Sequence, residues 1–225
     1  MPAPGDVCTL AHRAAHDLRG PLQRIEAFAE IVREDGADAL DGQSLRALGI
    51  VSRSAREAAA LVDRLLELAL ATCRPLRRGD ADVRASAEAA LDGLADRIER
   101  TGATVRLGEL GTVEADPELL TLLCAELLAN AVRFGEPGRA PDVRLDMDYT
   151  ERGAPSRLKV RDDGVGVPPE RRAAALEALE AGPDADGVTG AGLGLALCRT
   201  ICERHGWSLE LHGDAGATEV VITLD

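Results

Sequence analysis

Aromatic residues are nearly missing from this chain of 225 residues, which contains one Trp, one Tyr and two Phe. Hydrophobic residues nevertheless make up 45% of it, so a core has to be built from Leu, Val, Ile and Ala. No apolar run approaches the roughly 20 residues that a membrane-spanning helix needs. The N-terminus also lacks the basic and then apolar layout of a signal peptide. These absences predict a globular protein of one or two domains without a membrane span.

An excess of positive charge is absent as well. The formal net charge is −13, which argues against nucleic acid or an anionic membrane as the main partner. The five cysteines form no C-x-x-C motif, and their odd number predicts free thiols in a reducing cytoplasm. Cys198 and Cys202 are four residues apart on an expected helix, and we expect them to be small residues that face the core.

The N-terminal stretch has the apolar spacing of an amphipathic helix. The residues that share its apolar face are Val7, Ala14, Leu18, Leu22, Ile25, Phe28, Ala29 and Val32. His16 falls opposite the centre of this stripe, so its imidazole is expected to face solvent. Pro21 follows about one turn later and should bend the helix there.

A second amphipathic stretch runs from about Ser44 to Ala71, and the segment "EDGADALDG" between the two has Gly and Asp at the expected stop and start positions. This pattern predicts a helical hairpin. Two helices alone leave a long apolar face uncovered, and a homodimer that forms a four-helix bundle would cover it.

The chain changes character after a linker at about Cys73 to Asp80. Helices are expected over residues 84–101, from the capping pair Asp116 and Pro117 to Phe134, and over 193–205. Strands are expected at 103–107, 142–149, 157–163, 207–212 and 218–224. The predicted fold class is therefore α+β: a helical hairpin over residues 1–74, followed by a two-layer α/β sandwich over residues 75–225.

His16 and Asp17 form the first candidate site. A solvent-facing imidazole is a usable nucleophile near neutral pH, and an adjacent carboxylate can orient it or accept its proton. Taken alone, a surface histidine beside an aspartate is more often without function.

Glu126, Asn130 and Arg133 form the second candidate, because their spacing places them on one face of a helix. An acid and an amide offer oxygen ligands for Mg²⁺, and a guanidinium suits phosphate oxygens. A solvated polar stripe is the competing interpretation.

Two glycine-rich segments complete the set. In "VRDDGVGVPPE", Asp162 stands at the end of an expected strand and is followed by Gly164 and Gly166. The glycines would let the backbone approach a flat ligand closely, and the Asp162 carboxylate could accept a hydrogen bond from an amino group of that ligand. An ordinary acidic turn is the alternative. "GAGLGLALCRTI" opens a helix with Gly190, Gly192 and Gly194, which leaves N–H groups for phosphate; alone, this pattern has many false positives.

Together, these four segments are far more specific. The order H-D-x-x-x-P-L, N-A-x-R, D-x-G-x-G and G-x-G-L-G-L resembles the H, N, G1 and G2 boxes of bacterial two-component sensor histidine kinases. The resemblance runs through almost the whole chain, down to "ERHGWSLEL". It implies a dimerisation and phosphotransfer hairpin followed by a Bergerat-type ATP-binding domain.

The resemblance also implies roles for the candidate residues. His16 would be the phosphoacceptor and Asp17 its activating carboxylate. Asn130 would bind Mg²⁺ together with Glu126, and Arg133 would contact phosphate. Asp162 would accept from the adenine amino group, with Gly164 and Gly166 beside the base. The three lid residues are Gly190, Gly192 and Gly194.

The sequence departs from the family pattern in several places. Position 126 is Glu where many of these kinases have Asn, and position 20 is Gly where Thr or Asn is associated with dephosphorylation of the partner. Leu176 and Leu179 replace the usual lid phenylalanines. Because 15 residues precede His16, input is expected from a separate sensor or regulatory protein, or from a region outside this chain.

These observations lead to one hypothesis and two alternatives. We expect a cytoplasmic, homodimeric protein-histidine kinase that uses ATP and Mg²⁺, phosphorylates itself on His16 and passes the phosphoryl group to an aspartate of a response regulator receiver domain. The alternatives are a catalytically silent phosphotransferase or scaffold with the same fold, and an ATPase that uses Glu126.

Overall fold

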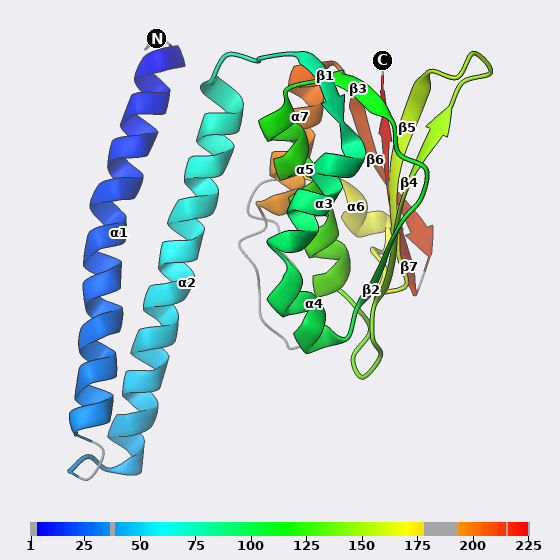
Figure 1. The fold of residues 1–225 in the computed structure, drawn as a ribbon. Coiled ribbons are helices and arrows are strands. Elements are labelled where there is room, and N and C mark those ends of the chain that lie inside the picture. The colour runs from blue at the N-terminus through cyan, green and yellow to red at the C-terminus, as the bar shows by residue number, and fades with distance from the viewer. Residues whose placement is uncertain (1–3, 37–38, 178–192, 215, 225) are drawn as a thin grey trace. The chain divides into compact units, whose positions relative to one another are not determined.

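The computed structural model describes residues 4–36, 39–177, 193–214 and 216–224. The chain divides into two compact units, Met1–Arg74 and Pro75–Asp225. The first unit contains only helices, and the second contains all the strands (Figure 1).

The first unit is a helical hairpin, as predicted. Helix α1 spans Pro4–Asp35 and helix α2 spans Gly42–Cys73, each with 32 residues. Asp41 caps α2, because its side chain accepts a hydrogen bond from the backbone N–H of Ser44 at 2.7 Å. Helix α1 continues through Pro21 as one element, although this proline has no N–H to donate to the preceding turn.

Small residues form the contact between the two helices. The buried residues of this unit are Ala15, Ala29, Ser52, Ala55 and Ala71. Side chains of this size allow two helices to approach closely, and larger apolar side chains such as Leu22, Leu61 and Leu66 are only partly buried. Leu10 is 69% exposed and Phe28 is 64% exposed. The uncovered apolar face that the sequence predicts is therefore present.

A disulfide joins Cys8 near the start of α1 to Cys73 at the end of α2, with the Cα atoms 5.9 Å apart. For these two residues the expectation of free thiols is wrong. The antiparallel arms have equal length, so the first turns of one helix lie beside the last turn of the other. Cys124, Cys198 and Cys202 form no disulfide and are buried, so the expectation that Cys198 and Cys202 face the core is confirmed.

The second unit has a five-stranded sheet in the order β2-β4-β5-β7-β6. Its strands are β2 (Thr104–Leu107), β4 (Asp142–Tyr149), β5 (Pro155–Asp162), β6 (Ser208–Asp214) and β7 (Ala217–Thr223). Strands β2 and β4 are parallel, and the other neighbours are antiparallel. One face of this sheet is covered by helices, which confirms the two-layer sandwich (Figure 1).

The helical layer contains α3 (Val83–Asp92), α4 (Ala95–Thr101), α5 (Pro117–Arg133) and α7 (Gly194–His205). The short helix α6 (Pro169–Ala175) follows β5 in the chain. Helix α5 is the centre of the core, and Leu120, Leu123 and Leu128 on it are at most 1% exposed. Its start is as predicted: Asp116 accepts from the N–H groups of Glu118 and Leu119.

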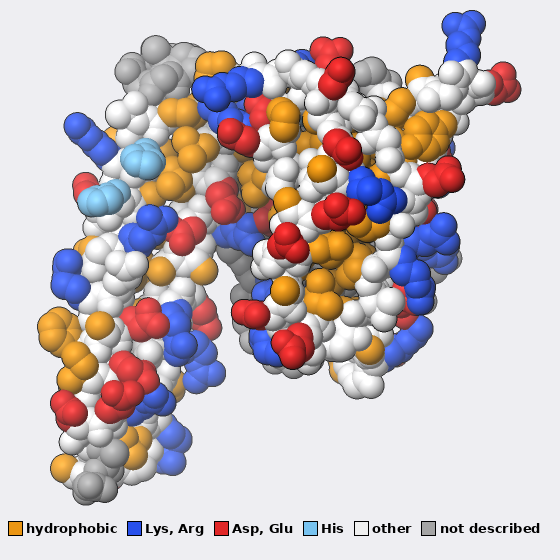
Figure 2. Space-filling view, in the orientation of Figure 1, with side chains coloured by type: hydrophobic (Ala, Val, Ile, Leu, Met, Phe, Trp, Pro, Cys, Tyr) orange, Lys and Arg blue, Asp and Glu red, His pale blue; other side chains and the backbone are white. Residues whose placement is uncertain are grey.

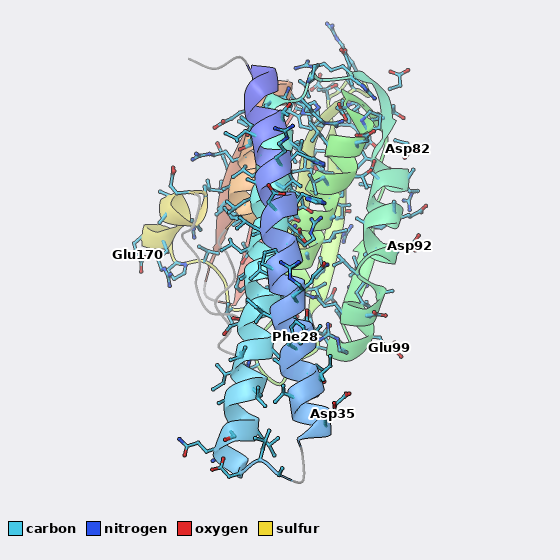
Figure 3. All side chains as sticks on the ribbon, turned by 90° about the vertical axis from the view of Figure 1, so that its left-hand side faces the viewer. Phe28, Asp35, Asp82, Asp92, Glu99 and Glu170 are labelled. Atoms are coloured by element: carbon cyan, nitrogen blue, oxygen red, sulfur yellow. A yellow bond between two sulfur atoms is a disulfide. The ribbon has the colours of Figure 1, made fainter. Side chains whose placement is uncertain are left out.

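Some elements differ from the prediction. Residues 84–101 form two helices, because the chain breaks at Gly93 and Leu94. The short strands β1 (Gly79–Asp82) and β3 (Thr112–Ala115) pair in a separate sheet, so β1 begins inside the expected linker. Exposed acids line the α3–α4 edge of this unit, with Asp82, Asp92 and Glu99 along it (Figure 3).

Candidate active site

His16 lies on the outer surface of α1, as its helical position predicts. Its side chain is 81% exposed, and that of Asp17 is 79% exposed. The His16 Nδ1 atom lies 3.3 Å from the Asp17 Oδ1 atom. When Nδ1 carries the proton, it donates to the carboxylate, and the Nε2 atom keeps its lone pair facing solvent. This is the arrangement that a nucleophilic imidazole requires.

Gly20 is one helical turn beyond His16 in the same helix. A Cβ atom at this position would have the Arg24 Nη1 atom as its nearest neighbour, at 3.5 Å, which is an ordinary contact. The helix therefore does not require glycine here for steric reasons.

Helix α5 carries the second group of candidates. Glu126 is 4% exposed, and Asn130 is partly buried. Both lie against the first residue of α7, because a Cβ atom at Gly194 would be 2.9 Å from Glu126 Oε2 and 3.2 Å from Asn130 Nδ2. The solvated polar stripe considered for this helix is thus wrong for Glu126. The structure brings Glu126, Asn130 and Gly194 together.

The donor set at this point suits a magnesium ion and phosphate. Carboxylate and amide oxygens are the ligands that Mg²⁺ prefers, usually with water and substrate phosphates. The Asn130 Nδ2 atom is buried and has no hydrogen-bond partner among the described residues, and a buried donor of this kind calls for a polar group beside it. Leu193 makes no side-chain cap hydrogen bond to α7, and N–H groups at the start of a helix suit an anion. In the described part of the chain, no group of three or more His, Cys, Asp or Glu is placed to hold a metal.

Arg133 is the last residue of α5. Its guanidinium carbon lies 5.4 Å from the centre of the Phe134 ring, and the residue is half-buried. At this distance the guanidinium and the ring make a cation–π contact. Its expected role toward phosphate stays a prediction.

Asp162 ends β5 and is 8% exposed, so the predicted burial of this carboxylate is present. Burial raises the pKa of Asp162 to about 6, against the opposing effect of the Gly164 and Thr218 backbone N–H groups. The Gly164 N–H donates to Oδ1 at 2.9 Å. An acceptor of this kind in a dry environment suits an amino group of a flat ligand.

The two glycines after Asp162 have different reasons to be glycine. A Cβ atom at Gly164 would lie 2.2 Å from the Phe134 carbonyl oxygen, so the close approach here is to the protein's own backbone. The Val165 N–H donates to that same oxygen at 3.0 Å. Gly166 has φ of 73°, in the left-handed region that favours glycine.

Three of the residues predicted to form the lid lie outside the described residues: Leu179, Gly190 and Gly192. Leu176 is the C-cap of α6.

A buried histidine supports the site and was not among the predicted site residues. The Asp116 N–H donates to His205 Nε2 at 3.0 Å, and His205 Nδ1 lies 2.8 Å from the Ile201 carbonyl oxygen. The ring stacks on Trp207 with centroids 4.6 Å apart. These contacts fix the start of α5 against the end of α7, the two helices that carry Glu126, Asn130 and Gly194. The motif "ERHGWSLEL" was the available signal.

Comparison with known proteins assigns both units. Residues 8–73 match the His Kinase A (phospho-acceptor) domain. Residues 115–225 match the family described as histidine kinase-, DNA gyrase B-, and HSP90-like ATPase.

Relatives match over most of this chain. The sensor histidine kinase AruS of Pseudomonas aeruginosa is 31% identical over 90% of this chain and 21% of its own length. The sensor protein QseC of Escherichia coli is 30% identical over 93% of this chain and 46% of its own length. The phytochrome-like protein Cph1 of Synechocystis is 26% identical over 94% of this chain and 28% of its own length. The chain thus spans less than half the length of these relatives.

Solved structures share the fold. Full-length ShkA in complex with AMPPNP gives a TM-score of 0.70 at 23% identity, over 99% of this chain and 46% of that one. The Acinetobacter baumannii histidine kinase AdeS gives a TM-score of 0.63 at 20% identity, over 93% of this chain and 97% of that one. At these identities the likeness concerns the fold alone.

The described helices include none with both the length and the apolar content needed to cross a membrane. A phospho-acceptor hairpin with an exposed histidine precedes an ATPase-type sandwich in which Glu126 and Asn130 of α5 lie against Gly194 of α7. The chain therefore belongs to the two-component sensor histidine kinases, as a catalytic core of this family.

Proposed function

We propose that this chain is an ATP-dependent protein-histidine kinase that phosphorylates itself on His16 and then passes the phosphoryl group to an aspartate of a response regulator. The observation that carries the proposal is the pairing of an exposed His16–Asp17 couple in a phospho-acceptor hairpin with a buried acid, amide and glycine cluster in an ATPase-type unit.

Charge and proton positions follow from the His16 geometry. The neutral imidazole attacks the γ-phosphorus of ATP through Nε2, the P–O bond to ADP breaks, and the ring becomes positively charged. Asp17, 3.3 Å from Nδ1, holds the ring proton and stabilises that charge. Transfer to the regulator's aspartate then returns the imidazole to its neutral form.

Glu126 and Asn130 are the residues proposed to hold Mg²⁺, because their oxygens match its ligand preference and they lie beside the start of α7. The ion would neutralise phosphate charge when bound. Arg133 adds a cation, and Asp162 accepts from the adenine amino group. The two glycines Gly164 and Gly166 shape the chain beside that base.

The proposal includes a homodimer and a cytoplasmic location. The exposed apolar side chains of the hairpin support the dimer. The proposed use of ATP and of a receiver domain supports the cytoplasm. The Cys8–Cys73 disulfide is a feature that argues the other way, because cytosolic thiols are kept reduced.

Incubation with γ-labelled ATP and Mg²⁺ tests the function. We expect acid-labile label on the chain, lost in His16→Gln and retained in the matched variant His12→Gln. Free phosphate as the sole product, abolished by Glu126→Gln, would favour the ATPase alternative. No labelled protein and no turnover would favour the silent phosphotransferase.

A further inference from the structure

A second histidine lies one helical turn before His16. His12 and His16 are four residues apart on α1 and are both exposed. Residues with this spacing are neighbours on one helix face, with Cβ atoms about 6 Å apart. Figure 2 shows two histidine side chains, in pale blue, next to one another on this helix.

We propose that His12 and His16 form a binding site for a divalent transition-metal ion such as Zn²⁺, and that occupancy of this site blocks phosphorylation of His16. The second clause rests on the proposed function, whereas the binding site itself does not.

The chemistry of two imidazoles at this spacing selects the ion. Histidines four residues apart on a helix can chelate one metal ion through their ring nitrogens. Imidazole nitrogen suits Zn²⁺, Cu²⁺ and Ni²⁺, whereas Mg²⁺ prefers oxygen. The Mg²⁺ needed for the kinase reaction therefore does not compete for this pair. Because the site has two protein ligands, water fills the other positions of the ion.

Asp17 determines which nitrogen of His16 faces the metal. Its Oδ1 atom lies 3.3 Å from His16 Nδ1, so it holds that nitrogen as the proton-bearing side and leaves Nε2 as the ligand. A carboxylate behind a metal-bound imidazole is the usual supporting contact at such sites, and it increases ligand basicity. Asp17 also supplies negative charge next to the cation.

The same lone pair serves both reactions. In the proposed kinase step, the Nε2 lone pair of His16 attacks phosphorus. When that pair is donated to a metal ion, it is not available to a phosphoryl group, and a phosphorylated Nε2 in turn cannot bind the metal. Metal binding and phosphorylation are therefore mutually exclusive at this atom.

Calorimetric titration of the full chain with Zn²⁺ tests the site directly. The protein is kept without thiol reductant, because free Cys8 and Cys73 thiolates would also bind zinc. We expect His12→Gln and His16→Gln each to lower the affinity by about tenfold or more, since each removes one of two chelating ligands. Equal affinity in the unmodified chain and in His12→Gln would overturn the site.

Autophosphorylation at fixed ATP and Mg²⁺, with increasing Zn²⁺, tests the consequence. His12→Gln should keep the basal rate and should need about tenfold more Zn²⁺ for half inhibition. Because both proteins see the same nucleotide, zinc bound to ATP affects them equally. The same half-inhibiting concentration in both would reject the inhibitory role. If the unmodified chain does not phosphorylate itself at all, the proposed function fails, while the calorimetry still decides the site.

Discussion

The fold buries the carboxylate of Asp162, although burial disfavours its ionised form. Its pKa is raised to about 6, chiefly by burial, so the ionised form is unfavourable in the folded chain at neutral pH. Replacing it with Asn should weaken ATP binding by roughly 1.5–3 kcal/mol, because the acceptor for the adenine amino group is weakened. Calorimetry with ATP and Mg²⁺ measures this, and unchanged affinity would contradict the assignment of Asp162.

We expect the same substitution to increase the stability of the fold at neutral pH, although it weakens ATP binding. A carboxyl whose folded pKa is raised contributes stability below its unfolded pKa of 3.8 and loses it as pH rises through about 6. Asp162→Asn removes this loss, so the variant should unfold at higher urea than the unmodified chain at pH 7.5. The difference should shrink between pH 6 and pH 4. A variant that is less stable at pH 7.5 would show that the carboxylate is needed by the fold.

The stability that His205 contributes to the fold depends on pH in the opposite direction. Its pKa is lowered, first by burial and also by Arg78 and Arg204, against the effect of the Ile201 carbonyl and Asp116. The neutral ring satisfies both neighbours, because Nε2 accepts and Nδ1 donates. Stability from this group is therefore present above about pH 6.5 and is lost as pH falls.

The stability gap between the unmodified chain and His205→Gln should accordingly narrow from pH 7.5 to pH 5. Urea unfolding followed by the fluorescence of Trp207, the single tryptophan and the stacking partner of this ring, reports the transition. A gap that stays constant with pH would mean that His205 does not titrate in this range.

At the scale of elements, the end of β5 is held against the end of α5 by a very close backbone contact. Gly164→Ala would place a methyl group 2.2 Å from the Phe134 carbonyl oxygen, so one segment must shift. We expect a loss of about 1–3 kcal/mol in the free energy of unfolding, together with weaker ATP binding, since Asp162 moves with this turn. The matched control is Gly79→Ala, where nothing lies within 4 Å of the new methyl group. Equal stability of the two variants would contradict the close contact.

The disulfide is the second device at this scale. It closes a loop of 65 residues between the two ends of the hairpin. Constraining a chain of this length should stabilise the hairpin by about 4 kcal/mol on the chain-entropy estimate. Thermal melting with and without dithiothreitol measures the effect, and Cys8→Ser should melt like the reduced chain. Dithiothreitol should not change the melting of Cys8→Ser; a similar shift in that variant would assign the effect to another cause.

The elements that sequence predicts well have strong local signals. Helix α5 begins at Pro117 because Asp116 caps it, and both residues are visible in the sequence. The β1–β3 pair was missed because each strand has only four residues and its partner is distant in the chain. The Cys8–Cys73 bond depends on the two helices having equal length, which spacing alone does not give. Gly164 was expected to approach a ligand, but its neighbour is a carbonyl 30 residues earlier, which only the fold brings close.

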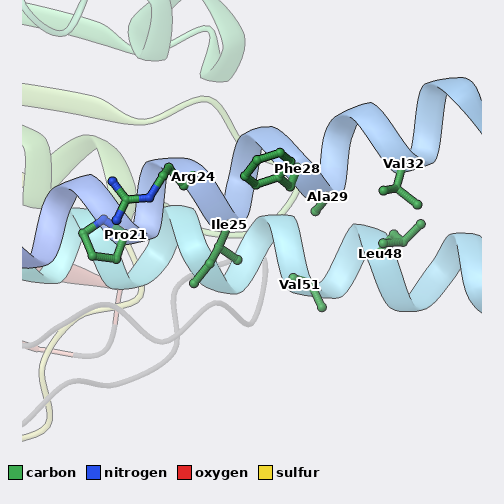
Figure 4. A pocket seen from close by; sticks show the side chains of 8 residues that line it. All are labelled: Pro21, Arg24, Ile25, Phe28, Ala29, Val32, Leu48 and Val51. Atoms are coloured by element: carbon green, nitrogen blue, oxygen red, sulfur yellow. The ribbon is translucent and has the colours of Figure 1, made fainter.

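On the scale of the whole molecule, the apolar surface of the hairpin requires a partner. A groove on this surface lies between the two helices (Figure 4), and its lining residues are Pro21, Arg24, Ile25, Phe28, Ala29, Val32, Leu48 and Val51. Phe28, 64% exposed, projects from α1 (Figure 3). Exposed apolar surface of this kind marks an interaction site, and a second copy of the hairpin can cover it as a four-helix bundle.

Association has to overcome charge repulsion, because each copy carries a formal net charge of −13. Burial of apolar surface at about 25 cal/mol per Å² must therefore supply the driving force, and screening by salt should strengthen the dimer. Sedimentation of the full chain at micromolar concentration should show twice the 23.6 kDa of one copy.

Phe28→Glu places a charge on the exposed apolar face of both copies and should shift the chain to a monomer. Tyr149→Glu is the matched control, since this aromatic side chain is 39% exposed but belongs to the sandwich unit, and we expect it to leave the dimer intact. Dimers in both variants would show that the contact lies elsewhere, and a folded monomer of the unmodified chain would exclude the bundle. Because the metal pair His12 and His16 lies on the same helix, the dimer would carry two such sites, one on each copy of α1.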